Sequence, residues 1–162
     1  MAFRWGGLID SGDALEPPPS GAEHARSSIE VVAYDRYEIS RHDDGSMLIS
    51  TVLTERFTGA IDGIGRADHL RLIYPDGSGI STGIERIDGA VAGRSGAFIL
   101  TAHGRDIGRG KVSGAWVVQS GSGTDQLEGL RGRGHYTAIA DEDGRWHAED
   151  EFDYWFAPTA SD

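Results

Sequence analysis

Two glutamates lie in strand-like segments where they could act as acids or bases. Glu55 alternates with Leu53 and Phe57, and Glu85 lies between Ile84 and Ile87. Alternate residues of a strand share one face, so Glu55 would face the same side as its apolar neighbours. A carboxyl group in an apolar cavity has a raised pKa and can transfer protons near neutral pH. Both glutamates could equally be charges on an outer wall, and the sequence leaves their orientation open.

Asp150 is a third carboxylate with the same pattern. It falls in phase with an apolar set formed by Trp146, Ala148, Phe152 and Tyr154. A side chain in that phase points to the same face as the aromatic residues. We take Glu85, Tyr136 and Asp150 as the candidate catalytic residues, with the outer-wall orientation of Asp150 as the alternative.

Aromatic and polar residues of the same segments are the candidates for substrate binding. A tyrosine hydroxyl can donate a hydrogen bond to a carbonyl or epoxide oxygen, and a tryptophan ring can form a flat wall against a ligand. The alternative is that these aromatic residues only fill a core. His103, which ends the apolar run that starts at Phe98, is placed at a barrel rim. The candidate set is Glu55, Phe57, Phe98, His103, Trp116, Phe152 and Tyr154.

Other chemistries are not supported by the spacing of residues. The six histidines are scattered, and His147 and Asp150 stand three apart on a predicted strand and so face opposite sides. We therefore predict no metal and no cofactor. The glycine-rich segments 104–110 and 121–124 lack the Gly-Lys-Ser/Thr ending of phosphate-binding loops, and Ser122 lacks a nucleophile elbow.

The amino-acid composition limits the kinds of binding partner that we expect. The 162 residues include 26 acidic and 15 basic side chains, for a formal charge of −11. Such a charge repels nucleic acid and anionic membranes, so we expect neither as a partner and expect a small apolar molecule instead. The absence of cysteine excludes disulfides, and the start of the chain lacks a continuous apolar stretch. We expect a soluble cytoplasmic protein that can form a homodimer.

The elements that would position these residues are β-strands. Runs rich in β-branched and aromatic residues alternate with Gly and Asp, which is typical of a sandwich or barrel. We predict strands at about 27–38, 46–60, 64–75, 78–90, 95–105, 110–120, 132–140 and 145–156. The joints between them include Asp62-Gly63 and four other turn segments, and one helical turn is expected at Thr124, with Thr124 as its cap.

Short joints force strands that are neighbours in sequence to pair antiparallel, and eight such strands can hide their edges by closing. We therefore predict a single closed antiparallel barrel of about eight strands, with a sandwich as the alternative. The barrel domain would span 27–157. Residues 1–26, rich in glycine and proline, would form a flexible arm or lid, and 158–162 a disordered tail.

Four segments of the chain resemble a bacterial family of unknown function whose known structures are barrels like allene oxide cyclase. They are FTGAIDGIG at 57–65, GIERIDG at 83–89, GRSGAFIL at 93–100 and GSGTDQLEGLRG at 121–132. The last segment departs from the family at 119–120 and at 124–125, which read Gln-Ser and Thr-Asp instead of Val-Pro and Thr-Gly. The resemblance implies a barrel and no established activity.

The sequence supports three candidate functions. The first is a cofactor-independent isomerase or cyclase that binds a small, largely apolar, polyketide- or terpenoid-like substrate inside the barrel. The second is a non-catalytic small-molecule-binding barrel, and the third is a structural or oligomerisation module with a filled interior. An open cavity that holds Glu85 or Asp150 favours the first two, and a solid interior favours the third.

Overall fold

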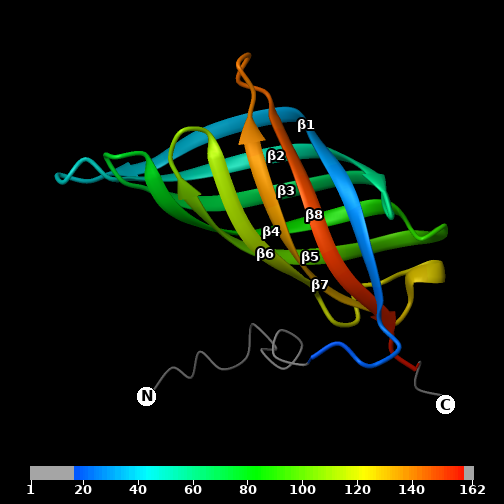
Figure 1. Ribbon diagram of the computed structural model, residues 1–162. Helices are drawn as coiled ribbons and strands as arrows, with labels where there is room; N and C mark the ends of the chain where they lie inside the picture. Colours follow the sequence, from blue (N-terminus) through cyan, green and yellow to red (C-terminus); the bar gives the residue numbers. More distant parts are fainter. Residues whose placement is uncertain (1–16, 159–162) are drawn as a thin grey trace, which may run out of the picture.

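The computed structural model of the chain describes residues 17–158, and these form one closed antiparallel β-barrel (Figure 1). Each strand pairs with its neighbours in sequence, and β1 pairs with β8 to close the cylinder. The strands are β1 (Glu23–Arg41), β2 (Met47–Gly59), β3 (Ile61–Ile73), β4 (Ser78–Val91), β5 (Arg94–Ile107), β6 (Lys111–Val118), β7 (Leu130–Ala140) and β8 (Trp146–Phe156). The predicted eight-stranded barrel is confirmed.

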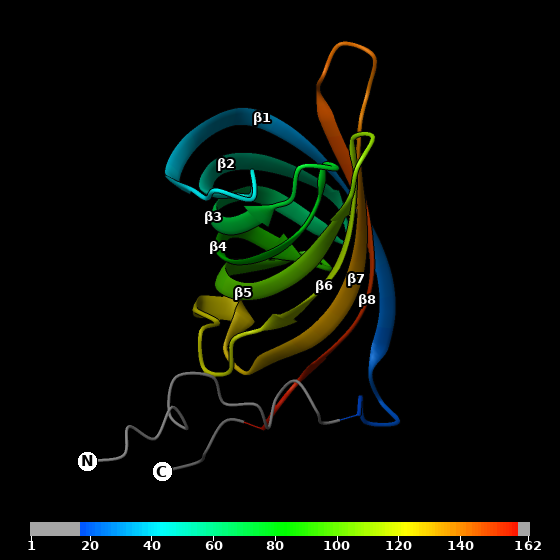
Figure 2. The same ribbon diagram turned by 90° about the vertical axis from the view of Figure 1, so that its left-hand side faces the viewer.

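Figure 2 shows β1 to β5 curving into an arc that β6, β7 and β8 complete. The β1/β2, β3/β4, β5/β6 and β7/β8 turns lie at one end, and the other turns lie at the opposite end with the start of β1. β1 begins at Glu23, so residues 23–26 are strand. The predicted lid formed by 1–26 falls mostly outside the described residues, as does most of the predicted tail.

Aspartate side chains fix three of the turns. Asp44 accepts hydrogen bonds from the backbone N–H and the hydroxyl of Ser46, and Asp76 does the same with Ser78. Asp141 accepts the N–H of Arg145 in the β7/β8 turn. An aspartate that binds the backbone a few residues further on stabilises a turn without help from the rest of the fold.

The prediction of a turn at Asp62-Gly63 is wrong. Both residues lie inside β3, and the turn between β2 and β3 is at Gly59-Ala60, where Gly59 has φ 122°. Gly63 is required for close contact instead, because a β-carbon there would stand 2.4 Å from the carbonyl oxygen of Asp88. A glycine in a strand marks either a bend or such a close approach, and the sequence alone does not separate them.

One end of the barrel is filled by a hydrophobic core. Large side chains from all eight strands pack there, and the segment between β6 and β7 folds across the opening. This segment holds the short 3-10 helix Asp125–Leu127, whose Leu127 is fully buried. The core residues include Ile61, Ile87, Val91, Phe98, Val118, Leu127, Leu130, Phe152 and Tyr154.

The helical turn predicted at Thr124 is present, but its predicted cap is wrong. The Thr124 hydroxyl makes no hydrogen bond to the helix backbone; it accepts the N–H of Ala97 at 3.0 Å. The neighbouring Ser122 hydroxyl likewise accepts the N–H of Ile99. Both hydroxyls therefore tie the closing segment to β5, where the backbone donors would otherwise be unpaired.

A β-bulge interrupts the alternation of β1. The register with β2 shifts between Val31 and Ala33, so one extra residue lies in β1. A bulge of one residue exchanges the faces of all residues that follow it. As a result, Val31 and Tyr34 both line the interior.

Candidate active site

The barrel encloses a cavity that adjoins the core, and Ile29, Phe57, Leu100, Trp116 and Ala148 belong to both. The centres of water-sized molecules can occupy about 100 Å³ of it. A dry cavity of roughly this size, about 150 Å³, accommodates a benzene-sized molecule. Most of the wall is apolar, with a few polar groups among them, which is the composition of small-molecule sites. The apolar lining residues are Ile29, Val31, Leu53, Phe57, Leu100, Ala102, Val112, Trp116, Ala138, Trp146 and Ala148, and the aromatic hydroxyls are those of Tyr34 and Tyr136.

Glu55 and Glu85 form a pair of carboxyl groups in this wall. Both line the cavity, from β2 and β4, and their side chains share a hydrogen bond. Burial raises the pKa of Glu85 well above its usual range, and the charge of Glu55 raises it further. Burial also raises the pKa of Glu55, while the hydrogen bond from Glu85 opposes that rise. Glu85 therefore keeps its proton to a higher pH than an ordinary glutamate, and its protonated carboxyl group can donate to Glu55.

One carboxyl oxygen of Glu85 remains without a hydrogen bond. Its Oε1 atom is buried and has no hydrogen-bond partner among residues 17–158. An unpaired buried carboxyl oxygen costs free energy, and such groups in native proteins call for an explanation. A ligand group or a bound water that donates to Oε1 would supply the missing partner.

Glycines on the inner face make the space for the polar side chains. A β-carbon at Gly65 would stand 1.9 Å from Oε1 of Glu85, and one at Gly83 would stand 2.4 Å from the His69 ring. The strands therefore carry a glycine opposite each of these bulky polar groups. Substituting either glycine would force the functional group to move.

Tyr136 is set into the wall in the same way. β-carbons at Gly104 and at Gly114 would each stand 2.5 Å from its hydroxyl oxygen. The hydroxyl shares a hydrogen bond with Ser81, and burial raises the pKa of Tyr136 above its usual value. Tyr136 therefore stays protonated at neutral pH and can donate a hydrogen bond.

His69 and Arg71 continue the polar groups of β3 toward the open end. Burial lowers the pKa of His69, and the positive charge of Arg71 lowers it further, so the imidazole is neutral at physiological pH. Arg71 forms an ion pair with Asp106 of β5, and both side chains are largely buried. This pair spans β4, the strand between β3 and β5, at the mouth of the cavity.

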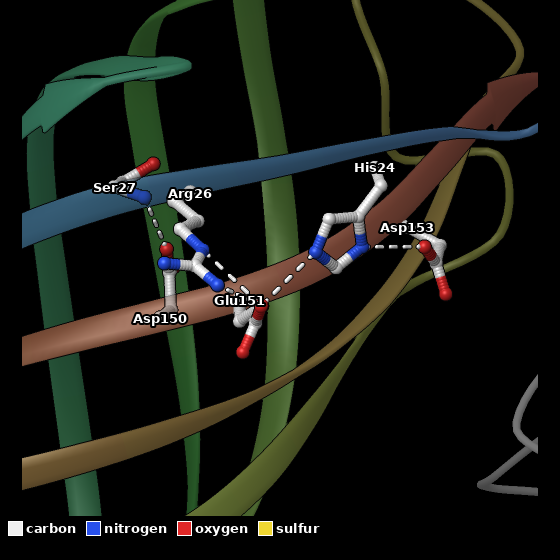
Figure 3. Close-up of polar contacts among 6 residues, drawn as sticks. All are labelled: His24, Arg26, Ser27, Asp150, Glu151 and Asp153. Carbon is white, nitrogen blue, oxygen red and sulfur yellow. Dashed lines mark hydrogen bonds and ion pairs between the residues drawn. The ribbon is translucent and has the colours of Figure 1, made fainter.

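Asp150 lies inside the barrel but outside the cavity wall. Its Oδ1 accepts the N–H of Ser27 at 2.9 Å (Figure 3). Its side chain is buried near the Trp116 indole, but Oδ2 has no partner of good hydrogen-bond geometry among the described residues. Burial raises the pKa of Asp150 to about 7, although the Ser27 N–H favours the ionised form.

The neighbours of Asp150 along β8 point outward and join β8 to β1 (Figure 3). Glu151 forms an ion pair with Arg26, and His24 lies between Glu151 and Asp153 at 3.1 and 2.9 Å. Hydrogen bonds to Asp153 and Glu151 raise the pKa of His24. The group is exposed, so it contributes little to stability and lies on the opposite side of the wall from the cavity.

The structure brings together half of the predicted site residues. Glu55, Glu85 and Tyr136 line the cavity, as do Phe57 and Trp116. Four more are buried beside or below it, in the packed half of the barrel: Asp150, Phe98, Phe152 and Tyr154.

His103 is exposed on the outer face of β5 and does not line the cavity. Its neighbours Ala102 and Gly104 occupy the inner face, where Ala102 lines the cavity and Gly104 lies against Tyr136. Because adjacent residues of a strand face opposite sides, His103 cannot share their face.

Several cavity residues were not singled out from the sequence. They are the polar Thr51, His69, Arg71 and Ser81 and the mouth residue Tyr34. A signal for His69 and Arg71 was present, since both share the phase of the buried Ile61 and Ala67 in β3. No local signal marks Tyr34, because the bulge that turns it inward is not visible in the residue pattern.

The fold and the site define a class: a small closed barrel with two neighbouring buried carboxyl groups in a largely apolar cavity. The chain belongs to the DUF3224 family of proteins of unknown function, whose family profile matches residues 25–154. The family resemblance expected from the four glycine-rich segments is thus confirmed, and no curated protein matches the chain.

A solved structure of the same family has a similar fold. It is a protein of unknown function from Shewanella oneidensis MR-1, 23% identical, with a TM-score of 0.63. The match covers 85% of this chain and 99% of the other. At this identity the likeness supports the fold alone. Within residues 17–158, no helix has the length and apolar character that crossing a bilayer requires.

Proposed function

We propose that the chain is a cofactor-independent isomerase or cyclase that moves a proton on a small, largely apolar molecule held in the cavity. The observation that carries the proposal is the Glu55–Glu85 pair, two buried carboxyl groups that line one cavity, with Oε1 of Glu85 left without a partner among residues 17–158. A base and an acid held side by side in an apolar chamber are the groups needed for proton abstraction next to a carbonyl.

The chemical steps balance without a cofactor. The Glu55 carboxylate takes a proton from the carbon beside a substrate carbonyl, so a C–H bond breaks and an O–H bond forms on Glu55. The electron pair moves onto the carbonyl oxygen, where Tyr136 or Glu85 donates a hydrogen bond to the developing charge. In an isomerisation, the same proton then returns to a different carbon, the carbonyl re-forms and the C=C bond shifts, which restores the Glu55 carboxylate. In a cyclisation, the enolate carbon instead attacks a second carbonyl carbon of the same substrate, a C–C bond forms, and Glu55 gives its proton to the alkoxide oxygen that results.

Deuterium exchange tests this proposal without knowledge of the natural substrate. Small cyclic and β,γ-unsaturated ketones are incubated with the protein in D₂O, and NMR follows deuterium entering at the carbon beside the carbonyl. We expect exchange with the natural sequence and its loss in Glu85→Gln and Glu55→Gln. Glu149→Gln, on the exposed face of β8, is the matched control. Equal exchange in all four proteins, or none above buffer, would overturn the proposal.

A non-catalytic binding barrel is the second candidate, favoured by the largely apolar wall of the cavity. Binding alone needs no acid or base. If Glu85→Gln keeps its affinity for the ketones while no protein accelerates exchange, this second function is supported instead.

The third candidate is self-association through the outer face of the barrel. Several apolar side chains on β1 to β4 are exposed, including Tyr37, Ile39, Val52, Leu70, Ile80 and Ile84. Exposed apolar patches of this kind mark contact surfaces. Sedimentation of the natural chain and of Ile84→Lys tests it, since a homodimer through this wall would dissociate in the variant.

A further inference from the structure

The mouth of the barrel carries a local excess of positive charge. The space in front of the cavity, about 500 Å³, is lined by four arginines, Arg36, Arg71, Arg109 and Arg145, and by a single carboxylate, Asp106. The chain as a whole has a formal charge of −11. The positive side chains at the mouth therefore oppose the charge of the rest of the protein.

This space adjoins the cavity. Val31, Tyr34, Arg71 and Trp146 line both. One ligand can thus place one end among the arginines and the other end between the apolar walls.

Two of the four arginines are occupied and two are not. Arg71 is paired with Asp106, and Arg145 lies 3.3 Å from Asp143. Arg36 and Arg109 have no hydrogen bond or ion pair with any residue of the described 17–158. Both free guanidinium groups remain available to a ligand.

The backbone of Arg109 is held in place by its neighbours. Arg109 has φ 58°, a conformation that a residue with a side chain rarely adopts, and it lies between Gly108 and Gly110. The carbonyl of Gly110 accepts the N–H of Ala140, and Asp106 accepts the N–H of Gly108. The left-handed backbone belongs to the β5/β6 turn, and these contacts fix the point from which the Arg109 side chain extends.

We propose that the ligand is an apolar carboxylic acid whose carboxylate binds Arg36 and Arg109 at the mouth. This rests on the proposed function, which it deepens by naming the substrate class. A guanidinium group binds a carboxylate through two parallel hydrogen bonds, and the local charge draws an anion to this end of the barrel.

The apolar part of such a ligand reaches the carboxyl pair. Arg71, which lines the mouth together with Arg36 and Arg109, lies four residues further along β3 than Ala67, which pairs with Glu85. At the rise of an extended strand this is about 13 Å, so the acid group stays apart from Glu55 and Glu85. The carbon chain of the ligand fills the distance between them.

Calorimetry with octanoate and 1-octanol tests the proposal. The two probes share a carbon chain and differ in charge. We expect octanoate to bind the natural chain about tenfold more tightly, because charge-assisted hydrogen bonds are worth about this much. Arg36→Gln and Arg109→Asn should each remove most of that advantage and leave octanol unchanged. Asn is chosen because it tolerates the left-handed backbone.

Arg66→Gln is the matched control, since Arg66 is exposed on the outer wall of β3 and the variant loses the same charge. Equal binding of the two probes, or equal loss in all three variants, would overturn the proposal. If octanol binds and octanoate binds no better, the cavity of the proposed function stands and only the carboxylate assignment fails. If neither probe binds, both fail. Thermal melts of each variant show that it is folded.

Discussion

Oε1 of Glu85 lies directly over Gly65, on the neighbouring strand, at a point where a β-carbon would be 1.9 Å away. The acid of the proposed pair therefore occupies the volume of an absent side chain. The same β-carbon would also stand 2.9 Å from the Phe57 ring, so Glu85 cannot simply shift toward Phe57. The position of the carboxyl group depends on glycine at 65.

Gly65→Ala should displace the Glu85 carboxyl group and separate it from Glu55. A misplacement of about 1 Å can lower a rate by about 100-fold, so deuterium exchange should fall by roughly that factor. The crowding should also destabilise the barrel by about 1–3 kcal/mol, measured by urea unfolding. Gly21→Ala is the control, because no atom lies within 4 Å of its β-carbon. Unchanged exchange in Gly65→Ala would contradict the role given to this position.

Asp150 should make the protein less stable as pH rises. Its pKa is raised from 3.8 to about 7 by burial, so the stabilising protonated form is present below pH 3.8 and is lost as pH rises through about 7. That shift corresponds to a loss of up to about 4 kcal/mol. Asp150→Asn should remove this part of the pH dependence of the unfolding free energy, whereas Glu149→Gln, on the exposed neighbour, should keep it. A parallel decline in both variants would refute the burial argument.

Asp106→Asn should free Arg71 at the mouth. The variant keeps an oxygen for the N–H of Gly108 but no longer neutralises the guanidinium group. Affinity for octanoate should rise several-fold and affinity for octanol should not change, because only a charged probe senses the released cation. Stability should fall by about 1–3 kcal/mol, the cost of leaving a buried polar group unpaired. Calorimetry that finds both affinities unchanged would show that Arg71 does not contact the ligand.

Ala102→Leu should close the cavity without unfolding the barrel. Ala102 lines the cavity from β5, and the added carbons would project into free space instead of into packed atoms. Octanol binding should weaken by at least about tenfold, since the larger side chain takes the volume of the ligand. Thr101→Leu adds bulk one residue earlier on the opposite face and should bind normally. Comparable affinity in the two variants would place the ligand elsewhere.

The strand alternation grouped residues by face, but it left open whether the face that carries Glu55 or Glu85 points inward. Glu55 shares its phase with Phe57, and Glu85 shares its phase with Ile87, and all four lie inside. His103 was misplaced because the run around it is apolar on both faces, so its phase was hidden by Ile99 and Thr101. Tyr34 was missed because a bulge precedes it.

The sequence could not predict how far along the barrel axis each inward-pointing side chain lies. Asp150 and Phe152 have the same inward phase as Ala148, yet only Ala148 lines the cavity. The height of each residue depends on the stagger of all eight strands, which no single strand encodes. Whether a level of the barrel is packed or hollow depends on how many large side chains meet at that level. Predicting this needs the register between neighbouring strands, which the sequence of one strand does not give.

The most direct test of the account is an NMR titration of the Glu55 and Glu85 side-chain carboxyl carbons in the natural chain. We expect Glu55 to lose its proton first and Glu85 to keep its proton to a pH well above the usual range of glutamate. Substitution of Glu55 by Gln should lower the pKa of Glu85, because the charge of Glu55 helps to raise it. If both carbons titrate together near the ordinary pKa of glutamate, the two groups do not share a proton and the proposed site is wrong.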